Sequence, residues 1–532
     1  MRTVRPQTTP SGTQAALSGE FRGLTGLRII AAAWVVLFHF HFTALPGMAD
    51  VVGVLGPLLT AGALGVDLFF VLSGFVIAHT YLDQLGPALR AGITARFVWA
   101  RLCRMWPAYA LVFHLFGIWL VVRSVLGSDS AIAFQSVQPV LDAGQYVQQL
   151  FMVQLWDDRY FDGASWVGST WSISAEWLAY LLFPVAALVF FRLRRLPAVV
   201  LAAAALALMA PQAVAYLTTG SPYYDWSWLV RILCGFGAGV FVYLAVRRIR
   251  WTARALDTAS VLAAVLPVAI ASGLLAGELV GPGRGGAVIA LFPLLVGVLS
   301  IADRGPARIL STDWAVHGGR LSYCLYLVHI PMFEIYWLAL HRFSWLAPQT
   351  VLAHIVGVLV LLATLPVAAW VYNSVEEPAR RRMRRAAAVV GRLPVRAGIA
   401  LGFLRARPAP LPDAGESTDG ALATAASRFA AKRRALAIAS GLDSAGEATT
   451  GAHAASPLRP PTLATALLTA QRRRPSHRAG IWANYERAEY IRGTYLRAGH
   501  AGRPLAGELH SSVGGRPCRL GPSPPISPWA PS

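Results

Sequence analysis

The feature that most constrains this chain is a series of apolar stretches, each long enough to cross a lipid bilayer. A membrane-spanning helix needs about 20 mostly apolar residues to cross a hydrocarbon layer of about 30 Å. Only 14% of the 532 residues are charged, whereas soluble proteins average about 25%. The sequence therefore predicts an all-α, polytopic integral membrane protein and excludes an ordinary soluble enzyme. The ten predicted spans are residues 27–45, 64–82, 106–123, 173–191, 198–217, 229–246, 258–276, 286–302, 321–340 and 351–374.

Arginine is distributed unevenly between the connections that join these spans. One alternating set of connections carries 17 arginines, whereas the other set carries only Arg159, Arg284 and Arg342. Basic residues are enriched on the cytoplasmic side of membrane proteins, so both termini are predicted to be cytoplasmic. The predicted location is the cell (plasma) membrane. Because orientation and a basic tail explain the formal net charge of +21, no nucleic-acid partner is expected.

Three segments follow from this pattern. Residues 1–26 are a polar, cytoplasmic N-terminal segment without a signal peptide, so the first span is expected to be retained. Residues 27–385 form the membrane domain. Residues 386–532 are rich in Ala, Arg and Pro and are expected to be a largely disordered cytoplasmic tail. Within the tail, Gly441–Ser444 reads Gly-Leu-Asp-Ser, but no aspartate follows Asp443, so no second catalytic domain is expected.

The longest connection on the arginine-poor side covers about residues 124–172 and is acidic and rich in glutamine and tryptophan. Residues 146–156 could form a short interfacial helix. Long ordered loops are often functional, so this segment is either a lid that faces a substrate or a packing loop.

The first span contains two ionisable residues, Arg28 and His39. Eleven steps of about 100° bring a helix back to within about 20° of its starting direction, with a rise of about 16 Å. Both side chains are therefore predicted to lie on one face. Ionisable groups inside a membrane tend to mark function. The alternatives are a snorkelling arginine at the membrane boundary and a histidine that only hydrogen-bonds to another helix.

Two carboxylates lie at a similar predicted depth in other spans. Asp67 lies near the outer end of the second span, close to the small residues Ser73 and Gly74, which favour close helix contact. Glu176 lies early in the fourth span, on the same helix face as Ser172. With His39, these residues predict an acid/base site near the outer surface. For Asp67, stabilisation of a helix N-terminus is the alternative explanation.

Further polar residues lie toward the predicted cytoplasmic side. Arg101 and Arg104 are three residues apart and could together bind phosphate groups, or could simply set the membrane orientation. Ser322 and His329 are seven apart in the ninth span, near one face in the inner half of the bilayer. The four cysteines are scattered and no metal-ligand spacing is present, so no metal is expected.

These residues, in this order, resemble the membrane acyltransferase-3 family of polytopic O-acyltransferases, which modify surface polysaccharides and some secondary metabolites. The resemblance covers about residues 22–385 and leaves the tail unexplained. The shared motifs are Arg28-x10-His39, Gly65-Val66-Asp67 with Ser73-Gly74-Phe75, Arg101-x2-Arg104 before Pro107, Trp171-Ser172-x3-Glu176, Ser322-Tyr323-x2-Tyr326-Leu327-x-His329 and Glu377-Pro378.

The resemblance implies an acyl-CoA-dependent transfer, of acetyl by default, from the cytoplasm to a hydroxyl of a carbohydrate or secondary-metabolite acceptor. No permanently bound cofactor is implied, since acyl-CoA is a substrate. His39 is then the base or a transient acyl carrier, and Glu176, together with Asp67, orients it. The donor would be held by the residues Arg28, Arg101, Arg104, Ser322 and His329.

Two other classes of function remain open from the sequence. A secondary transporter or proton-coupled flippase also buries His, Asp and Glu in the membrane. Such proteins often contain internal repeats, and no convincing repeat is visible here. A structural or sensing protein would explain the apolar spans, but not the set of ionisable residues within them.

Overall fold

The computed structural model describes residues 19–126 and 131–390. Within these residues ten helices are long and apolar enough to cross a membrane, which confirms the ten predicted spans. Predictions about the tail, including Gly441–Ser444, lie outside the described residues. The helices that build the spans are α2 (Arg22–Phe40), α5 (Leu64–Leu85), α6 (Ala91–Leu126), α8 (Trp171–Leu193), α9 (Ala198–Leu208), α10 (Ala210–Thr219), α11 (Ser227–Val246), α12 (Ala253–Val280), α13 (Phe292–Ile301), α15 (Asp313–Arg342) and α16 (Val351–Val371). Shorter helices are α3 (Pro46–Leu55), α4 (Pro57–Thr60), α7 (Ala143–Leu150), α14 (Pro306–Leu310) and α17 (Glu377–Val390).

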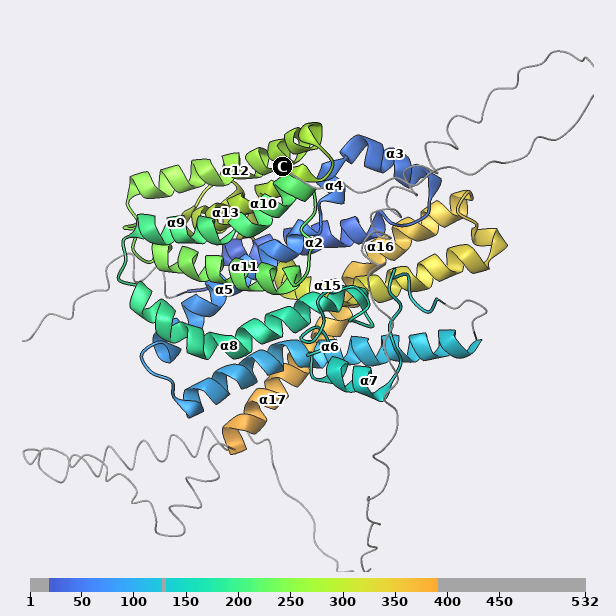
Figure 1. The fold of residues 1–532 in the computed structure, drawn as a ribbon, viewed down its shortest axis with the longest axis horizontal. Helices are drawn as coiled ribbons and strands as arrows, with labels where there is room; N and C mark the ends of the chain where they lie inside the picture. The colour runs from blue at the N-terminus through green and yellow to red at the C-terminus, as the bar shows by residue number, and fades with distance from the viewer. Residues whose placement is uncertain (1–18, 127–130, 391–532) are drawn as a thin grey trace, which may run out of the picture.

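The long helices run side by side and differ in how deeply they are buried (Figure 1). In the most apolar stretch of α5 and of α11, 72% of the residues are buried, compared with 28% in α12 and 22% in α16. Helices α5 and α11 are thus central, whereas α12 and α16 present much of their apolar surface outward. In a bilayer that surface contacts lipid, so these two helices line the rim of the bundle.

Helices α5 and α11 are parallel and in register, and an ion pair joins them near each end. The Arg231 guanidinium donates to both carboxylate oxygens of Asp67 at 2.9 and 2.8 Å, and Arg247 donates to Asp83 at 3.1 Å. Both pairs join residues that are 164 positions apart, which is the offset expected of two helices that run in the same direction.

Between these two ion pairs, glycines let the backbones of α5 and α11 approach closely. A Cβ atom on Gly74 would lie 1.9 Å from the carbonyl oxygen of Phe236, and one on Gly239 would lie 2.0 Å from that of Val71. Small residues at helix crossings are a common packing device in membranes. The predicted role of Gly74 in close helix contact is confirmed.

We expect Gly74→Ala to lower the free energy of unfolding by about 1–3 kcal/mol, because the added methyl group forces two backbones apart. Thermal unfolding of the purified protein in detergent measures the change. Gly92→Ala, the same substitution at a position where a Cβ meets nothing within 4 Å, is the control and should leave the melting temperature unchanged. Equal melting temperatures for both variants would contradict the close contact.

A second parallel pair is formed by α2 and α15. Arg22 pairs with Asp313 at 2.5 Å near the start of both helices. At the other end, the indole nitrogen of Trp337 donates to the hydroxyl of Thr43 at 2.9 Å. The two contacts have offsets of 291 and 294 residues, so the helices stay in register along their length.

Several span boundaries differ from those predicted, and three of them illustrate the difference. Helix α6 begins at Ala91 rather than at residue 106, α15 begins at Asp313 rather than at 321, and α2 ends at Phe40 rather than at 45. Hydropathy detects only the part of a helix that crosses hydrocarbon. The polar first turns of α6 and α15 continue the same helices beyond the apolar stretch.

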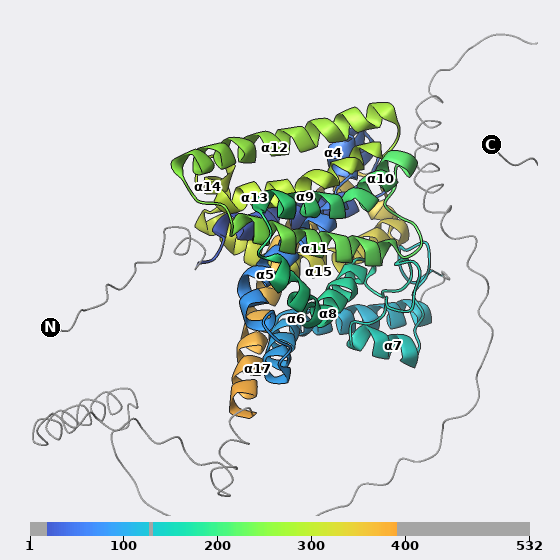
Figure 2. The same ribbon diagram turned by 60° about the vertical axis from the view of Figure 1, so that its left-hand side comes forward.

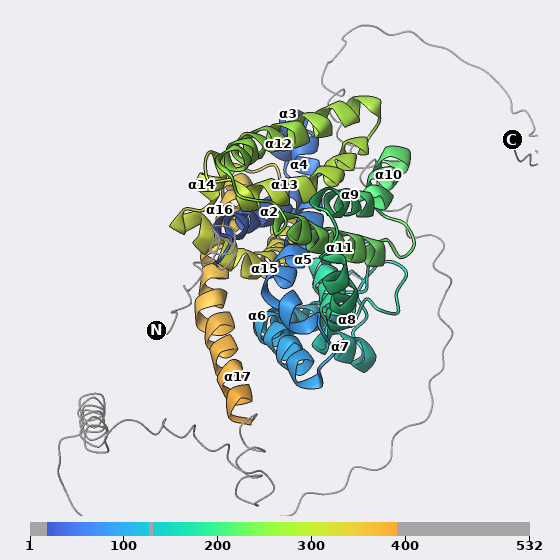
Figure 3. The same cartoon turned by 90° about the vertical axis from the view of Figure 1, so that its left-hand side faces the viewer.

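Helix α16 continues through a π turn, η4 (Tyr372–Glu376), directly into α17. Figures 2 and 3 show α17 projecting beyond the other described helices, next to the first part of α6. Trp99 of α6 donates to the carbonyl oxygen of Met383 at 3.2 Å. The end of the bundle that holds α17 and the start of α6 is called the α17 end below.

The connection at residues 131–170 is a folded cap at the opposite end of the bundle. Glutamine side chains bond to backbone carbonyls of the cap, since the buried Gln149 donates to the carbonyl of Ala164 at 2.9 Å and the half-buried Gln135 to that of Trp166 at 3.0 Å. Glu334 of α15 accepts from the backbone N–H of Phe134 at 2.8 Å. The short helix of the cap is α7, which covers Ala143–Leu150 and so begins and ends earlier than the predicted residues 146–156. The cap is packed on the helices rather than free of them.

Candidate active site

Two histidines meet inside the bundle, between α2 and α15. The Nε2 atom of His329 lies 3.2 Å from the Nδ1 atom of His39, and the ring centroids are 5.0 Å apart. His329 is fully buried, whereas His39 is partly exposed. Aromatic side chains surround the pair, including Phe38 against His39 and Tyr326 and Phe333 against His329. The pair joins residues from the first and ninth spans.

The hydrogen bonds of this pair determine which nitrogen of His39 carries the proton. Nδ1 of His39 also lies 3.0 Å from the carbonyl oxygen of Val35. Because a carbonyl can only accept, we assign the hydrogen to Nδ1, where it is shared between Val35 and His329. Nε2 of His39 then carries a free lone pair. A neutral imidazole held in this way is suited to accept a proton or to attack a carbonyl carbon.

The predicted depths of His39, past the midplane, and of His329, in the inner half of the bilayer, do not fit together, because the two rings lie side by side. Helix α15 starts at Asp313, beside Arg22 of α2, and the two helices stay in register. His39 and His329 therefore lie at the same depth, about 25 Å along their helices from that pair. The early start of α15, which hydropathy does not detect, accounts for the error.

Glu176 belongs to a separate hydrogen-bonded group formed by α5 and α8. Ser73 and Tyr180 both donate to one carboxylate oxygen of Glu176, at 2.6 and 2.5 Å. Ser172, one turn before Glu176, hydrogen-bonds to the hydroxyl of Tyr326 at 2.7 Å. Among the described residues no hydrogen bond joins Glu176 to His39. In this structure Val35 and His329, and not Glu176, hold the His39 ring.

Asp67 is not brought to the histidines either. Its carboxylate is engaged on both oxygens by Arg231, and both side chains are almost completely buried. The Arg231 guanidinium also stacks over Trp171, 4.9 Å from the ring centroid. Such a two-point pair fixes the orientation of both side chains. Arg231 is the charged residue of the predicted span 229–246. A charge inside a span indicates a buried partner, and this signal was not used in the prediction.

An arginine cluster lies nearer the α17 end, formed by Arg104, which pairs with the carboxylate of Glu376, and by Arg28 and Arg380, whose charges reach Arg104. Arg104 forms an ion pair with Glu376 and lies over the ring of Tyr323, at 5.5 Å. The charges of Arg28 and Arg380 act on Arg104. Arg28 lies 5.7 Å from the Phe69 ring, and its Nε has no hydrogen-bond partner among the described residues. Arg28 and Arg104, which were predicted to bind the same ligand, therefore lie close enough for their charges to interact. Glu376, the partner of Arg104, was not predicted.

Arg101 and Ser322 lie outside the arginine cluster. Arg101 turns toward α5 and α8, where it donates to the Tyr81 hydroxyl at 3.0 Å and lies over the Tyr180 ring at 5.9 Å. It thereby adjoins the Glu176 group. The Ser322 hydroxyl donates back to Gly319 of its own helix at 2.8 Å. The spacing of Arg101 and Arg104 places them on neighbouring faces of α6, which pack against different helices.

Polar side chains thus form a column through the bundle. The Glu176 group adjoins Arg101 and, through Ser172, reaches Tyr326, which lies against His329. The histidine pair comes last, next to the cap. Arg28 and His39 lie eleven residues apart on α2, which is about 16 Å. This arrangement can bind an anionic group at one place and supply a base at another.

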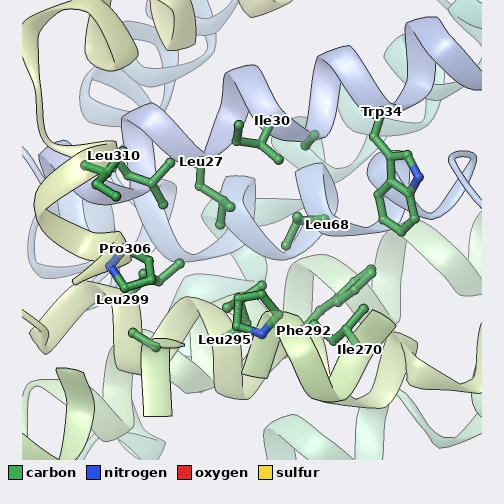
Figure 4. Close-up of a pocket in the computed structure, with 14 residues that line it drawn as sticks. Leu27, Ile30, Trp34, Leu68, Ile270, Phe292, Leu295, Leu299, Pro306 and Leu310 are labelled. Carbon is green, nitrogen blue, oxygen red and sulfur yellow. The ribbon is translucent and has the colours of Figure 1, made fainter. Parts of the chain in front are cut away.

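An apolar groove of about 290 Å³ lies on a different side of α2 (Figure 4). Leu27, Ile30 and Trp34 of α2 face Phe292 and Leu295 of α13 across it. Because these α2 residues point away from Arg28 and His39, the groove is separate from the polar column. Among the described residues no group of three His, Cys, Asp or Glu side chains is placed to hold a metal ion.

The fold and site together define a multi-pass α-helical membrane protein with an interior that is polar, basic and histidine-containing. Residues 21–373 match the family model described as an acyltransferase domain, and the chain belongs to this acyltransferase-3 family. The resemblance inferred from the motifs is thereby confirmed. Family membership and the names of the relatives support a transferase activity.

Three relatives illustrate the similarity. Acyltransferase MdmB of Streptomyces mycarofaciens is 29% identical over 168 residues, 30% of this chain and 38% of that protein. A Staphylococcus aureus protein named provisionally as an O-acetyltransferase is 29% identical over 166 residues, 31% of this chain and 24% of that protein. Protein 2 in the picA locus of Rhizobium radiobacter is 32% identical over 123 residues, 23% of this chain and 56% of that protein. Each match spans less than two thirds of the relative. No solved structure matches the chain.

Proposed function

We propose that the protein is a membrane O-acyltransferase that moves an acyl group, acetyl by default, from cytoplasmic acyl-CoA to a hydroxyl of a carbohydrate or related acceptor. The proposal depends on the hydrogen bonds of His39: Nδ1 lies within hydrogen-bond distance of the Val35 carbonyl and of His329, so the lone pair of Nε2 is available to a substrate. The arginine cluster supports the donor, because acyl-CoA carries several phosphate charges that guanidinium groups bind well. The α17 end would then face the cytoplasm of the plasma membrane, as the arginine bias predicts.

The reaction that this geometry favours is a general-base transfer. Nε2 of His39 takes the proton of the acceptor hydroxyl while the oxygen attacks the thioester carbon. The carbon–sulfur bond breaks, and the thiolate leaves and receives that proton, so the imidazole returns to its neutral form. In the variant with a transient acyl carrier, Nε2 itself attacks the thioester carbon, the carbon–sulfur bond breaks and the CoA thiolate leaves. The acceptor oxygen then attacks the acyl carbon, the bond between that carbon and Nε2 breaks, and the hydroxyl proton passes to the thiolate.

Arg28→Gln is expected to raise the KM for acetyl-CoA by about 10- to 100-fold, because a hydrogen bond to a charged group contributes about 1.5–3 kcal/mol. Arg28 is the preferred variant, since among the described residues it forms no ion pair that its removal would break. Arg22→Gln, six residues earlier on the same helix and paired with Asp313, is the control and should leave this KM unchanged. Purified protein in lipid nanodiscs and labelled acetyl-CoA provide the assay. Equal KM values for Arg28→Gln and the unmodified protein would contradict the proposed donor site.

The acceptor is tested in cells. Alkali-labile esters on surface glycans or exported metabolites should be present in the parent strain, absent after deletion, and restored by the unmodified gene. Mass spectrometry of the extracted material identifies both acyl group and acceptor. Movement of a substrate across the membrane without any ester would instead favour a transporter.

A further inference from the structure

The arginine cluster already contains an anion, Glu376, which is completely buried. It pairs with Arg104, whose side chain is 20% exposed, and the charges of Arg28 and Arg380 also act on Arg104. Arg380 has a second partner in Glu377. The buried carboxylate thus balances the charge of Arg104 at a place where two further guanidinium groups, those of Arg28 and Arg380, repel Arg104 in a medium of low dielectric constant.

The backbone that presents Glu376 is unusual. Glu376 is the last residue of the π turn that joins α16 to α17, and π turns are rare and frequent at functional sites. The thiol of Cys324 donates to its second carboxylate oxygen at 3.1 Å. Glu376 is thus held from two sides, by Arg104 and by Cys324, at a junction where the helix register can change.

We infer that Glu376 is a positioning residue that occupies, in the unloaded protein, the place that a donor phosphate takes on Arg104. This inference rests on the proposed function, since it names the residue with which the acyl-CoA phosphates compete. When the donor binds, a phosphate replaces the carboxylate, Arg104 keeps an anionic partner, and Glu376 turns away through the π turn. When the product CoA leaves, Glu376 returns and keeps Arg104 from being left unpaired.

The test measures binding of CoA itself to the full-length protein in nanodiscs by isothermal titration calorimetry. Glu376→Gln keeps the shape of the side chain and removes its charge, so CoA should bind about tenfold more tightly. In the transfer assay the KM for acetyl-CoA should fall while kcat does not rise, because the product also leaves more slowly. A purely structural role would not produce this division between KM and kcat. The control is Asp257→Asn, which removes one charge from the exposed pair with Arg304 and should change CoA affinity less than twofold.

Cys324→Ala provides a second variant that leaves the buried ion pair intact. Without the thiol, Glu376 is held less firmly, and CoA should bind at least twofold more tightly. Unchanged or weaker CoA binding by folded Glu376→Gln overturns the inference. If that variant does not fold, unchanged or weaker binding by Cys324→Ala overturns it.

Inorganic pyrophosphate serves as a second probe that separates the two proposals. If the unmodified protein binds neither CoA nor pyrophosphate, the proposed donor itself is wrong. If it binds CoA in a manner that depends on Arg28, while both variants bind no more tightly, only the role of Glu376 is wrong.

Discussion

His39→Gln is expected to lower kcat for acyl transfer by about 10²- to 10⁴-fold, the range attributed to a positioned general base. The structure leaves Nε2 of His39 free and fixes the ring through Val35 and His329. Glutamine can keep a hydrogen bond to the Val35 carbonyl but cannot accept the acceptor's proton. Single-turnover transfer from labelled acetyl-CoA measures the effect, and CoA affinity should stay unchanged because the donor's phosphates bind elsewhere.

The control for this prediction is His41→Gln, two residues further along the chain. His41 hydrogen-bonds to the Phe38 carbonyl just after the end of α2, and burial lowers the pKa of its imidazole. It does not contact His329 through any hydrogen bond in the described structure and should keep nearly full activity. A folded His39→Gln protein with an unchanged rate would remove His39 from the chemistry. If acyl-His39 can be trapped with labelled donor alone, the transient carrier replaces the general base.

Removal of one partner of the buried Asp67–Arg231 pair is expected to have the largest effect on stability. Asp67→Ala leaves the Arg231 guanidinium buried without its counter-charge, which costs about 3–5 kcal/mol. Arg231→Ala leaves the Asp67 carboxylate in the same position and should cost a similar amount. Both variants are expected to melt well below the unmodified protein, or to be lost during purification in detergent.

Asp83→Ala is the matched control, because Asp83 pairs with Arg247 on the same two helices but at an exposed position. Exposed pairs contribute about 1 kcal/mol or less. A double replacement, Asp67→Leu with Arg231→Met, should restore much of the stability, since no unpaired charge remains. If this double variant is stable and active, Asp67 is structural; if it is stable and inactive, Asp67 takes part in the reaction.

Much of the fold could be predicted from the sequence because a bilayer imposes a length and a composition on each span. All ten spans were found in this way, and the errors lie at their ends. The polar turns that start α6 at Ala91 and α15 at Asp313 carry no hydropathy signal. The packing of one helix against another was not predictable either, with the exception of Gly74, whose lack of a side chain itself indicates a close contact.

For the candidate site, residue types were predicted better than their partners. The periodicity of α2 placed Arg28 and His39 on one face, but no sequence pattern shows that His329, 290 residues away, lies beside His39. Asp67 and Glu176 lie at plausible depths, yet depth does not specify which side chains they contact. Asp67 pairs with Arg231, and Glu176 accepts hydrogen bonds from Ser73 and Tyr180. Glu376 was missed because beside Glu377 and the following arginines it has the pattern of an ordinary helix end.

The two parallel helix pairs have a mechanical consequence. Helices α5 and α11 are clamped by charges near both ends, and α2 and α15 are tied by Arg22–Asp313 and by Trp337–Thr43. A slip of one turn, about 5.4 Å, along either axis would break both ties of a pair at once. Sliding within each pair is therefore resisted, chiefly by the buried Asp67–Arg231 ion pair and by the buried hydrogen bond between Trp337 and Thr43. Any opening that admits reactants is expected to come from tilting or unwinding at the periphery, around a core that keeps its length and register.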